Sequence, residues 1–276
     1  MIKKIVEVIP EKNIIILSPH YDDVPLTFGG YLNELTHNQL VKTKNIRIVN
    51  IFSRSNYQAR DDQGNSDGSL KRMQFATGIR LLEDLNCLDA LIGKGHYSYE
   101  IKAERECVVR QKNWKPGEAF EFPQGTRNDF DDEDWQIFNR IKKYAREWLL
   151  LKETALLLPI GIKEHIDHII LREAVIETLN ELDQKVAATI YFGEDQPYTG
   201  LADKADWAKI RDFISKNPVD HADYLIDEGK KTKLVWDYYP TQVEDSYREG
   251  ILNRSKQLKE ENESNSGVER IYRLKR

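Results

Sequence analysis

Four apolar runs of strand length restrict most tightly how this chain can fold. They lie at residues 13–17, 46–52, 155–159 and 187–192. Such runs are typical of strands that are buried on both faces, as in parallel sheets. Helical patterns separate the runs, and strands that alternate with helices predict parallel βαβ units.

The remaining segments complete one predicted α/β domain over residues 1–276, with a mostly parallel sheet flanked by helices. Polar residues 53–69 predict a long loop, and loops of that length are often functional. Residues 94–124 contain only short alternating pieces and predict an excursion from the main fold. From about residue 203 the pattern is mainly helical, and residues 268–276 predict a final strand or a docked tail.

An acidic run at residues 129–134 precedes the helical pattern of residues 135–151. Acidic residues at a helix start and basic residues further on complement the helix dipole. Charge runs usually lie in solvent, so the run is interpreted as a solvated helix N-terminus.

The composition excludes several classes of function. The formal net charge is -5, so we expect no nucleic-acid partner, which would require a basic face. Cys87 and Cys107 are too few for a disulfide framework, which favours thiols in a reducing compartment. No segment approaches the roughly 20 apolar residues of a membrane span. We therefore expect a cytoplasmic protein without a membrane span, and the oligomeric state stays open.

Acidic and imidazole side chains follow three of the four predicted strands. In open α/β sheets, ligands bind outside the carboxyl ends of the strands, so these side chains are expected to converge on one edge. The residues are His20, Asp22 and Asp23 after the first strand, His165, Asp167 and His168 after the third, and Glu194, Asp195 and Tyr198 after the fourth.

Their spacing favours a metal site. His20 and Asp23 are three residues apart on a turn that opens a helix, and His165 and His168 share one face of a helix start. Two imidazoles and a carboxylate form a common ligand set for catalytic zinc, which keeps a fourth position for water. Ferrous iron and manganese remain alternatives. Either motif alone is weak, because Asp23 also suits a helix cap and two surface histidines often lie on the same helix turn.

Five motifs resemble, in order, those of the LmbE/PIG-L family of zinc-dependent N-deacetylases. The two specific ones are SPHYDDVPLTFGG at residues 18–30 and LLLPIGIKEHIDHIILREA at residues 156–174. The supporting ones are IRLLEDLNC, YFGEDQPY and YYPTQ. Tyr21 and Val24 replace the proline and the acid of the family's commonest first motif, and neither position is a ligand there.

The resemblance implies a Rossmann-like α/β fold and removal of acetyl groups from N-acetyl sugars, often N-acetylglucosamine conjugates. It implies Zn²⁺ ligands at His20, Asp23 and His168, a general base at Asp22, and an orienting carboxylate at Asp167. It also implies that His165 stabilises the oxyanion or protonates the leaving amine, and that Arg80 supports the substrate or the site.

Sugar recognition is expected from polar groups near the strand ends. The candidates for substrate binding are Arg80, Glu194, Asp195 and Tyr198.

Three other functions remain to be weighed against this one. An amidase for a larger acyl group or a thiol conjugate would use the same metal chemistry. A catalytically silent sugar-binding relative would need to lack the base or a ligand, and all are present. A dinucleotide-dependent oxidoreductase is disfavoured, because Gly29 and Gly30 lack the Gly-x-Gly-x-x-Gly spacing after the first strand.

Overall fold

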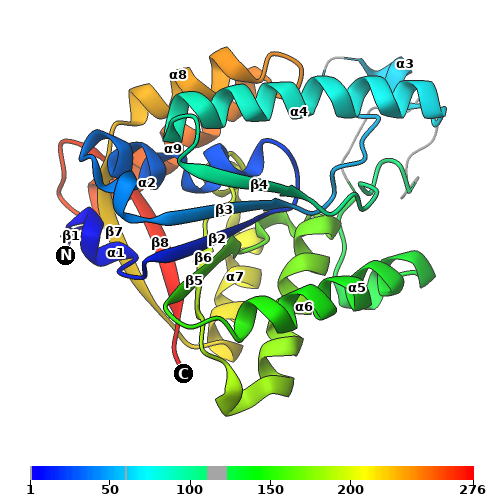
Figure 1. The fold of residues 1–276 in the computed structure, drawn as a ribbon. Helices are drawn as coiled ribbons and strands as arrows, with labels where there is room; N and C mark the ends of the chain where they lie inside the picture. The colour runs from blue at the N-terminus through cyan, green and yellow to red at the C-terminus, as the bar shows by residue number, and fades with distance from the viewer. Residues whose placement is uncertain (1, 60, 111–122) are drawn as a thin grey trace.

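The computed structural model describes residues 2–59, 61–110 and 123–276 (Figure 1). Its strands form one sheet with the order β1-β7-β8-β6-β5-β2-β3-β4. The strands are β1 (Ile2–Lys3), β2 (Asn13–Ser18), β3 (Asn45–Asn50), β4 (Tyr97–Ile101), β5 (Thr154–Pro159), β6 (Thr189–Gly193), β7 (Val219–Ile226) and β8 (Gly267–Leu274).

The helices lie in two layers, one on each face of the sheet (Figure 1). The layers contain α2, α4, α8 and α9 on one face and α5, α6 and α7 on the other. The bounds are α1 (Ile5–Val8), α2 (Asp23–His37), α3 (Asp62–Asn65), α4 (Leu70–Ile92), α5 (Asp132–Leu149), α6 (Ile166–Leu182), α7 (Lys204–Lys216), α8 (Glu228–Tyr238) and α9 (Asp245–Glu261). None of these helices combines the length and the apolarity that a membrane crossing requires.

Strand β2 shows why the apolar runs are continuous. It pairs in parallel with both β3 and β5, so it lies inside the sheet. Ile14 and Ile16 pack with the layer of α2 and α4, whereas Ile15 and Leu17 pack with the layer of α5 and α6. Because both faces are covered, apolar residues are favoured at every position. The predicted mostly parallel sheet flanked by helices is confirmed.

Gly30 lies where α2 packs against strands β7 and β8. A Cβ atom at this position would overlap the carboxylate of Glu269 and the side chain of Ile226. Glycine therefore lets α2 approach β7 and β8 closely, and it lies inside the helix rather than in a turn.

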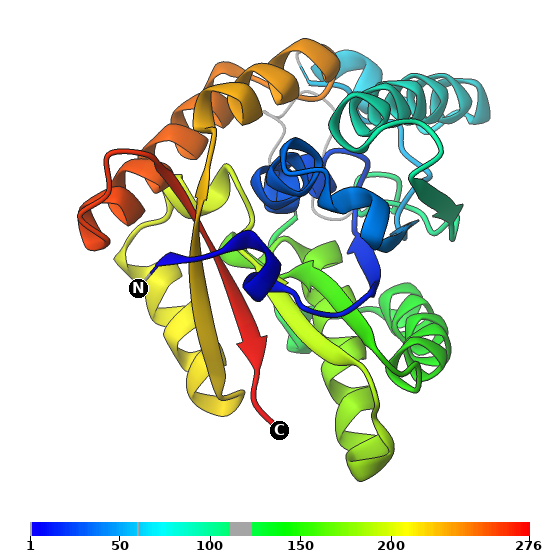
Figure 2. The same ribbon diagram turned by 60° about the vertical axis from the view of Figure 1, so that its left-hand side comes forward.

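The helices predicted in the C-terminal part are present as α7, α8 and α9. The eight-residue strand β7, which lies between α7 and α8, was not predicted. Figure 2 shows β7 beside the final strand β8, which pairs with it in antiparallel fashion. The expected final strand is thus present, and it enters the sheet between β6 and β7.

Two predictions about the middle of the chain also change. The expected excursion at residues 94–124 includes β4, which extends the sheet beside β3, and its residues 111–122 lie outside the described residues. Some polar side chains of the loop at residues 53–69 are buried rather than solvent-exposed. Asn56 and Asn65 are both buried, and the Asn56 side-chain amide donates to the carbonyl of Asn65 at 2.7 Å.

The acidic run before α5 is only partly solvated. Asp131 caps the helix by accepting hydrogen bonds from the backbone N–H groups of Glu133 and Asp134, each at 2.9 Å. Asp134, however, is fully buried. Its carboxylate forms an ion pair with Arg110, which corrects the interpretation of the run as a solvated helix start.

Candidate metal centre and catalytic pocket

Three neighbouring parallel strands bring the predicted site residues together. Strands β6, β5 and β2 are adjacent in the sheet and point the same way, so their carboxyl ends share one edge. The turn between β2 and α2 contributes His20, Asp22 and Asp23. The start of α6 after β5 contributes His165, Asp167 and His168, and Asp195 follows β6.

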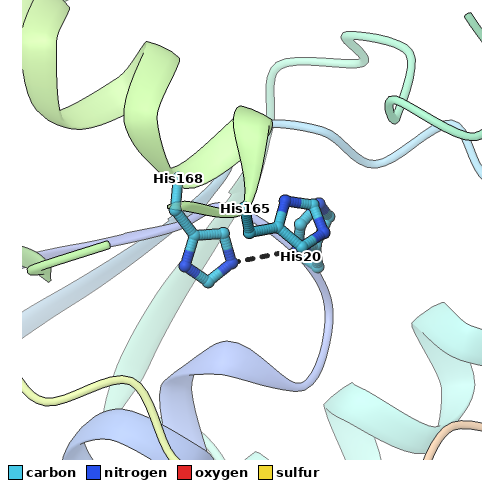
Figure 3. Close-up of side chains that lie close together, drawn as sticks. All are labelled: His20, His165 and His168. Atoms are coloured by element: carbon cyan, nitrogen blue, oxygen red, sulfur yellow. Dashed lines mark hydrogen bonds between the residues drawn. The ribbon is translucent and has the colours of Figure 1, made fainter. Parts of the chain in front are cut away.

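Three buried donor atoms face one another at this edge. Nδ1 of His20 lies 3.2 Å from Oδ2 of Asp23. Nε2 of His168 lies 3.3 Å from the same Asp23 oxygen and 3.3 Å from Nδ1 of His20 (Figure 3). The three atoms therefore form a nearly equilateral triangle.

Two further carboxylates fix which nitrogen of each imidazole carries hydrogen. Nε2 of His20 lies 3.0 Å from Oδ2 of Asp167, and Nδ1 of His168 lies 2.6 Å from Oδ1 of Asp195. An ionised carboxylate only accepts hydrogen bonds, so both of these ring nitrogens donate. In the neutral rings, the nitrogens that face Asp23 then carry lone pairs.

This donor set fits a divalent cation. Three lone pairs that face one another repel, and a proton or a cation between them removes the repulsion. Tetrahedral zinc with nitrogen and oxygen ligands at about 2.0–2.1 Å requires neighbouring donors about 3.3 Å apart, which matches the triangle of His20, Asp23 and His168. Hydrogen bonds from ligand imidazoles to carboxylates are also a common feature of zinc sites.

His165 offers an alternative third imidazole. One nitrogen from each of His20, His165 and His168 lies within 4.8 Å of the others, and Figure 3 shows the three side chains close together. The Asp23 oxygen lies 3.2 Å from the His20 donor and 3.3 Å from the His168 donor. Both distances match the spacing of about 3.3 Å between neighbouring donors on tetrahedral zinc.

The surrounding carboxylates favour positive charge on the two imidazoles that face Asp23. Burial lowers the pKa of His20, but hydrogen bonds to Asp167 and Asp23 outweigh burial and raise the pKa to about 9. Burial likewise opposes protonation of His168, and the charge of Asp23 with the hydrogen bond to Asp195 raises its pKa. The same carboxylates would stabilise a cation held by these rings.

Asp22 lies beside this cluster and lines the pocket. Burial and the neighbouring Asp23 carboxylate raise the pKa of Asp22 to about 6, against the opposing influence of Arg80. Oδ1 of Asp22 is 3.9 Å from Nη2 of Arg80. A carboxylate with a pKa close to neutral is suited to general base catalysis.

His165 is oriented as a neutral hydrogen-bond donor. Its Nδ1 accepts a hydrogen bond from the backbone N–H of Asp167 at 3.3 Å. Burial and the nearby His20 and His168 hold the pKa of His165 well below its usual value. A neutral ring whose Nδ1 accepts carries its hydrogen on Nε2, so His165 suits oxyanion stabilisation as an imidazole rather than as a cation.

The pocket over these residues has a volume of about 70 Å³. Its wall combines the charged cluster with aromatic and apolar side chains. The aromatic and apolar residues are Tyr57, Tyr198, Tyr247, Leu26 and Val108. Of the four predicted substrate-binding residues, Arg80 and Tyr198 line this pocket. Glu194 and Asp195 are not in its lining, and Asp195 instead contacts His168.

Glu194 forms an ion pair with Arg254 instead of lining the pocket. Both of its oxygens accept hydrogen bonds from Arg254 at 2.6 Å, and the Tyr272 hydroxyl donates to one of them at 2.9 Å. The structure thus places Glu194 in a buried ion pair between β6, β8 and α9.

We expect Glu194→Gln to lower the free energy of unfolding by about 3–5 kcal/mol, because it leaves the buried Arg254 charge uncompensated. Urea unfolding measures this loss. The KM for substrate is expected to remain unchanged at a temperature where the variant is folded. A raised KM with wild-type stability would restore Glu194 to substrate binding.

Four pocket or support residues escaped the sequence analysis: Tyr57, Tyr247, Glu106 and Arg110. Glu106 and Arg110 follow β4, which pairs in parallel with β3 at the edge of the sheet. Identification of β4 would have made them candidates by the same reasoning about strand ends. However, β4 is an edge strand with partly exposed residues, so it lacks a continuous apolar run. Tyr57 and Tyr247 carry no spacing signal.

Several solved structures with a similar fold are deacetylases. The zinc-inhibited form of teicoplanin deacetylase Orf2 has a TM-score of 0.66 and 16% identity over 96% of this chain and 98% of that chain. The A40926 pseudoaglycone deacetylase Dbv21 has a TM-score of 0.62 and 16% identity over the same shares. The N,N'-diacetylchitobiose deacetylase from Pyrococcus horikoshii has a TM-score of 0.56 and 14% identity over 96% of this chain and 84% of that one.

Comparisons based on sequence alone give a different result. No protein-family model matches the chain, and no curated protein matches it. The likeness therefore concerns the fold, and at this level the resemblance to the LmbE/PIG-L deacetylases is confirmed.

Proposed function

We propose that this chain is a zinc-dependent N-deacetylase that releases acetate from an N-acetyl sugar or a glycoconjugate. The observation that carries the proposal is the triangle of buried donors from His20, Asp23 and His168, with edges of 3.2–3.3 Å. The similar fold of the teicoplanin, A40926 and diacetylchitobiose deacetylases supports a substrate of this class.

The proposed metal ligands, as well as Asp22 and His165, each have a proposed part in amide hydrolysis. A divalent cation held by His20, Asp23 and His168 would supply a Lewis acid that makes water nucleophilic at neutral pH. Asp22 accepts the proton of the attacking water, a contribution of roughly 10²–10⁴-fold. The proton then passes to the amine nitrogen as the C–N bond breaks, so that acetate and the free amine leave. Neutral His165 donates its Nε2 hydrogen to the carbonyl oxygen as negative charge develops there, which is typically worth about 3 kcal/mol.

The other pocket residues bind and orient the substrate in this proposal. Arg80 and Tyr198 contact polar groups of the sugar, and the aromatic rings of Tyr57 and Tyr247 form the wall against which it packs. The pocket volume of about 70 Å³ favours a small acyl group such as acetyl. Asp167 and Asp195 orient His20 and His168 rather than the substrate.

A panel of N-acyl sugars tests this function. The purified protein is loaded with Zn²⁺ and incubated with N-acetylglucosamine, N,N'-diacetylchitobiose, an N-acetylglucosaminyl glycopeptide and N-octanoyl glucosamine, and acetate and free amine are measured. We expect acetate release from at least one N-acetyl substrate. Free amine from the octanoyl substrate alone would indicate an amidase for larger acyl groups, and no product from any of them would contradict the proposal.

Removal of the metal is expected to abolish the activity and to lower the thermal stability. A ligand at 100 times its dissociation constant stabilises the folded state by about 2.7 kcal/mol, so Tm should fall in a chelator and recover on addition of Zn²⁺. Calorimetry with parallel acetate assays measures both effects. Full activity after exhaustive chelation, with no metal remaining by elemental analysis, would contradict a metal-dependent mechanism.

The proposal also includes a single catalytic domain in the cytoplasm. Every strand of the described residues belongs to one sheet, which supports one domain. Cys87 and Cys107 are both buried free thiols, in keeping with a reducing compartment.

A further inference from the structure

A buried chain of charged side chains extends from the metal centre to the start of α5. The Arg110 guanidinium donates through Nη2 to Oδ1 of Asp167 at 2.6 Å, and its Nε lies 3.1 Å from Oδ1 of Asp134. All three side chains are fully buried. The other oxygen of Asp167 accepts from His20, so the chain ends on a proposed ligand.

The two oxygens of Asp167 are assigned to different partners. Oδ1 accepts from Arg110, whereas Oδ2 contacts Nε2 of His20 and accepts from the backbone N–H of Cys107 at 2.9 Å. Arg110 therefore binds the carboxylate oxygen that does not contact the imidazole. With Oδ1 engaged in this way, Oδ2 remains directed at His20 and fixes the ring so that Nδ1 faces Asp23.

Holding α5 and α6 together does not by itself explain why the charged side chains of Arg110, Asp134 and Asp167 are buried. Helices α5 and α6 already pack through apolar residues of one core, among them Ile137, Ile141, Leu171 and Val175. A buried ion-pair triad generally adds little stability compared with apolar packing, because each charge is desolvated. This triad contacts the proposed ligand His20 directly through Asp167, and that location indicates a role in the site.

We propose that Arg110, anchored by Asp134, is a positioning residue for the metal centre. Through Asp167 it keeps His20 in the orientation and tautomer that present Nδ1 to the cation. This inference rests on the proposed metal site. Outer partners of metal ligands typically change metal affinity by about 10–100-fold when they are mutated, and Arg110 acts one step beyond such a partner.

Zinc affinity of the metal-free protein tests the role without any substrate. Competition with a chromophoric chelator gives the dissociation constants of wild type, Arg110→Gln and Arg110→Lys. We expect Arg110→Gln to weaken zinc binding by about 10-fold or more. Lysine keeps the charge but not the planar fork that reaches two carboxylates, so Arg110→Lys should lie between Arg110→Gln and wild type.

Arg105→Gln is a matched control. Arg105 forms an ion pair with Glu133 across the same two segments, but both side chains are partly exposed. Arg105 contacts Arg110 through its backbone carbonyl, which the substitution keeps. We expect wild-type zinc affinity in this variant. An equal loss of affinity in Arg105→Gln and Arg110→Gln would show a general loosening of the segment and would overturn the proposal.

A double-mutant cycle tests whether Arg110 acts through Asp167. If it does, Arg110→Gln/Asp167→Asn should bind zinc no more weakly than Asp167→Asn alone, because residues in one network are not additive. Multiplied losses in the double variant would overturn the inference. So would wild-type affinity in Arg110→Gln.

A milder variant covers the case in which Arg110→Gln does not fold. Asp134→Asn keeps an oxygen that can accept from the backbone N–H of Asp131, as Asp134 does at 3.1 Å, but it removes the anchoring charge. We expect weaker zinc binding in Asp134→Asn and in Arg110→Lys. Wild-type affinity in both would overturn the proposal.

The outcome also separates this inference from the proposed function. If wild type binds zinc and Arg110→Gln binds it equally well, only the inference fails. If Arg110→Gln binds zinc weakly but wild type releases no acetate from any substrate, the inference stands and the proposed function fails. If wild type binds no divalent metal, both fail.

Discussion

Asp22→Asn is expected to lower kcat by about 10²–10⁴-fold, because asparagine cannot accept the proton of the attacking water. The amide has nearly the same shape as the carboxyl group, and Asp22 is not one of the three triangle donors. Zinc content and KM should therefore remain close to wild type. Steady-state kinetics together with elemental analysis measure the three quantities.

Asp84→Asn is the control for this experiment. Asp84 is a buried carboxyl group on α4 that accepts hydrogen bonds from Tyr239 and Tyr99 and is not part of the pocket lining. Its substitution should leave kcat unchanged where the variant is folded. Wild-type kcat in Asp22→Asn would exclude Asp22 as the base.

The second large effect distinguishes the two possible ligand sets. His168→Ala and Asp23→Ala each remove one donor of the triangle, and we expect zinc affinity to fall by more than about 100-fold, beyond the loss caused by an outer partner. His165→Ala should retain zinc while kcat falls by about 10²–10³-fold, as expected when one oxyanion donor is lost. Chelator competition and acetate release measure the two effects separately.

The opposite pattern would contradict this ligand set. Loss of zinc in His165→Ala, with retention in Asp23→Ala, would assign the metal to the three histidines. The alanine variants of His165 and His168 are suitable partners for comparison, because both rings are buried and come from the same turn of α6.

The central part of the fold was accessible from sequence because burial on both faces leaves a continuous apolar run. Strands β2 and β5 are of this kind, and the residues after them could be assigned to one sheet edge. The short edge strand β4 and the alternating strand β7 lack such a run, since each has exposed positions. The two opposite ends of the sheet, where these strands lie, could not be predicted for that reason.

The local sequence also could not distinguish adjacent residues that have different partners in the structure. Glu194 and Asp195 follow the same strand, yet Asp195 contacts a proposed ligand and Glu194 binds Arg254. The partner of Glu194 is 60 residues further along the chain, on a helix whose position depends on the whole fold. Arg110 was missed similarly, because its partners Asp134 and Asp167 come from two other segments.

The pairing of β2 with β5 has a consequence for how the metal centre is assembled. The proposed ligands His20 and His168 are 148 positions apart in the chain, so neither half of the protein can offer a complete coordination sphere by itself. A cation that binds there bridges the two halves of the protein. Resistance to proteolysis across the entire chain should then rise with the concentration of free zinc.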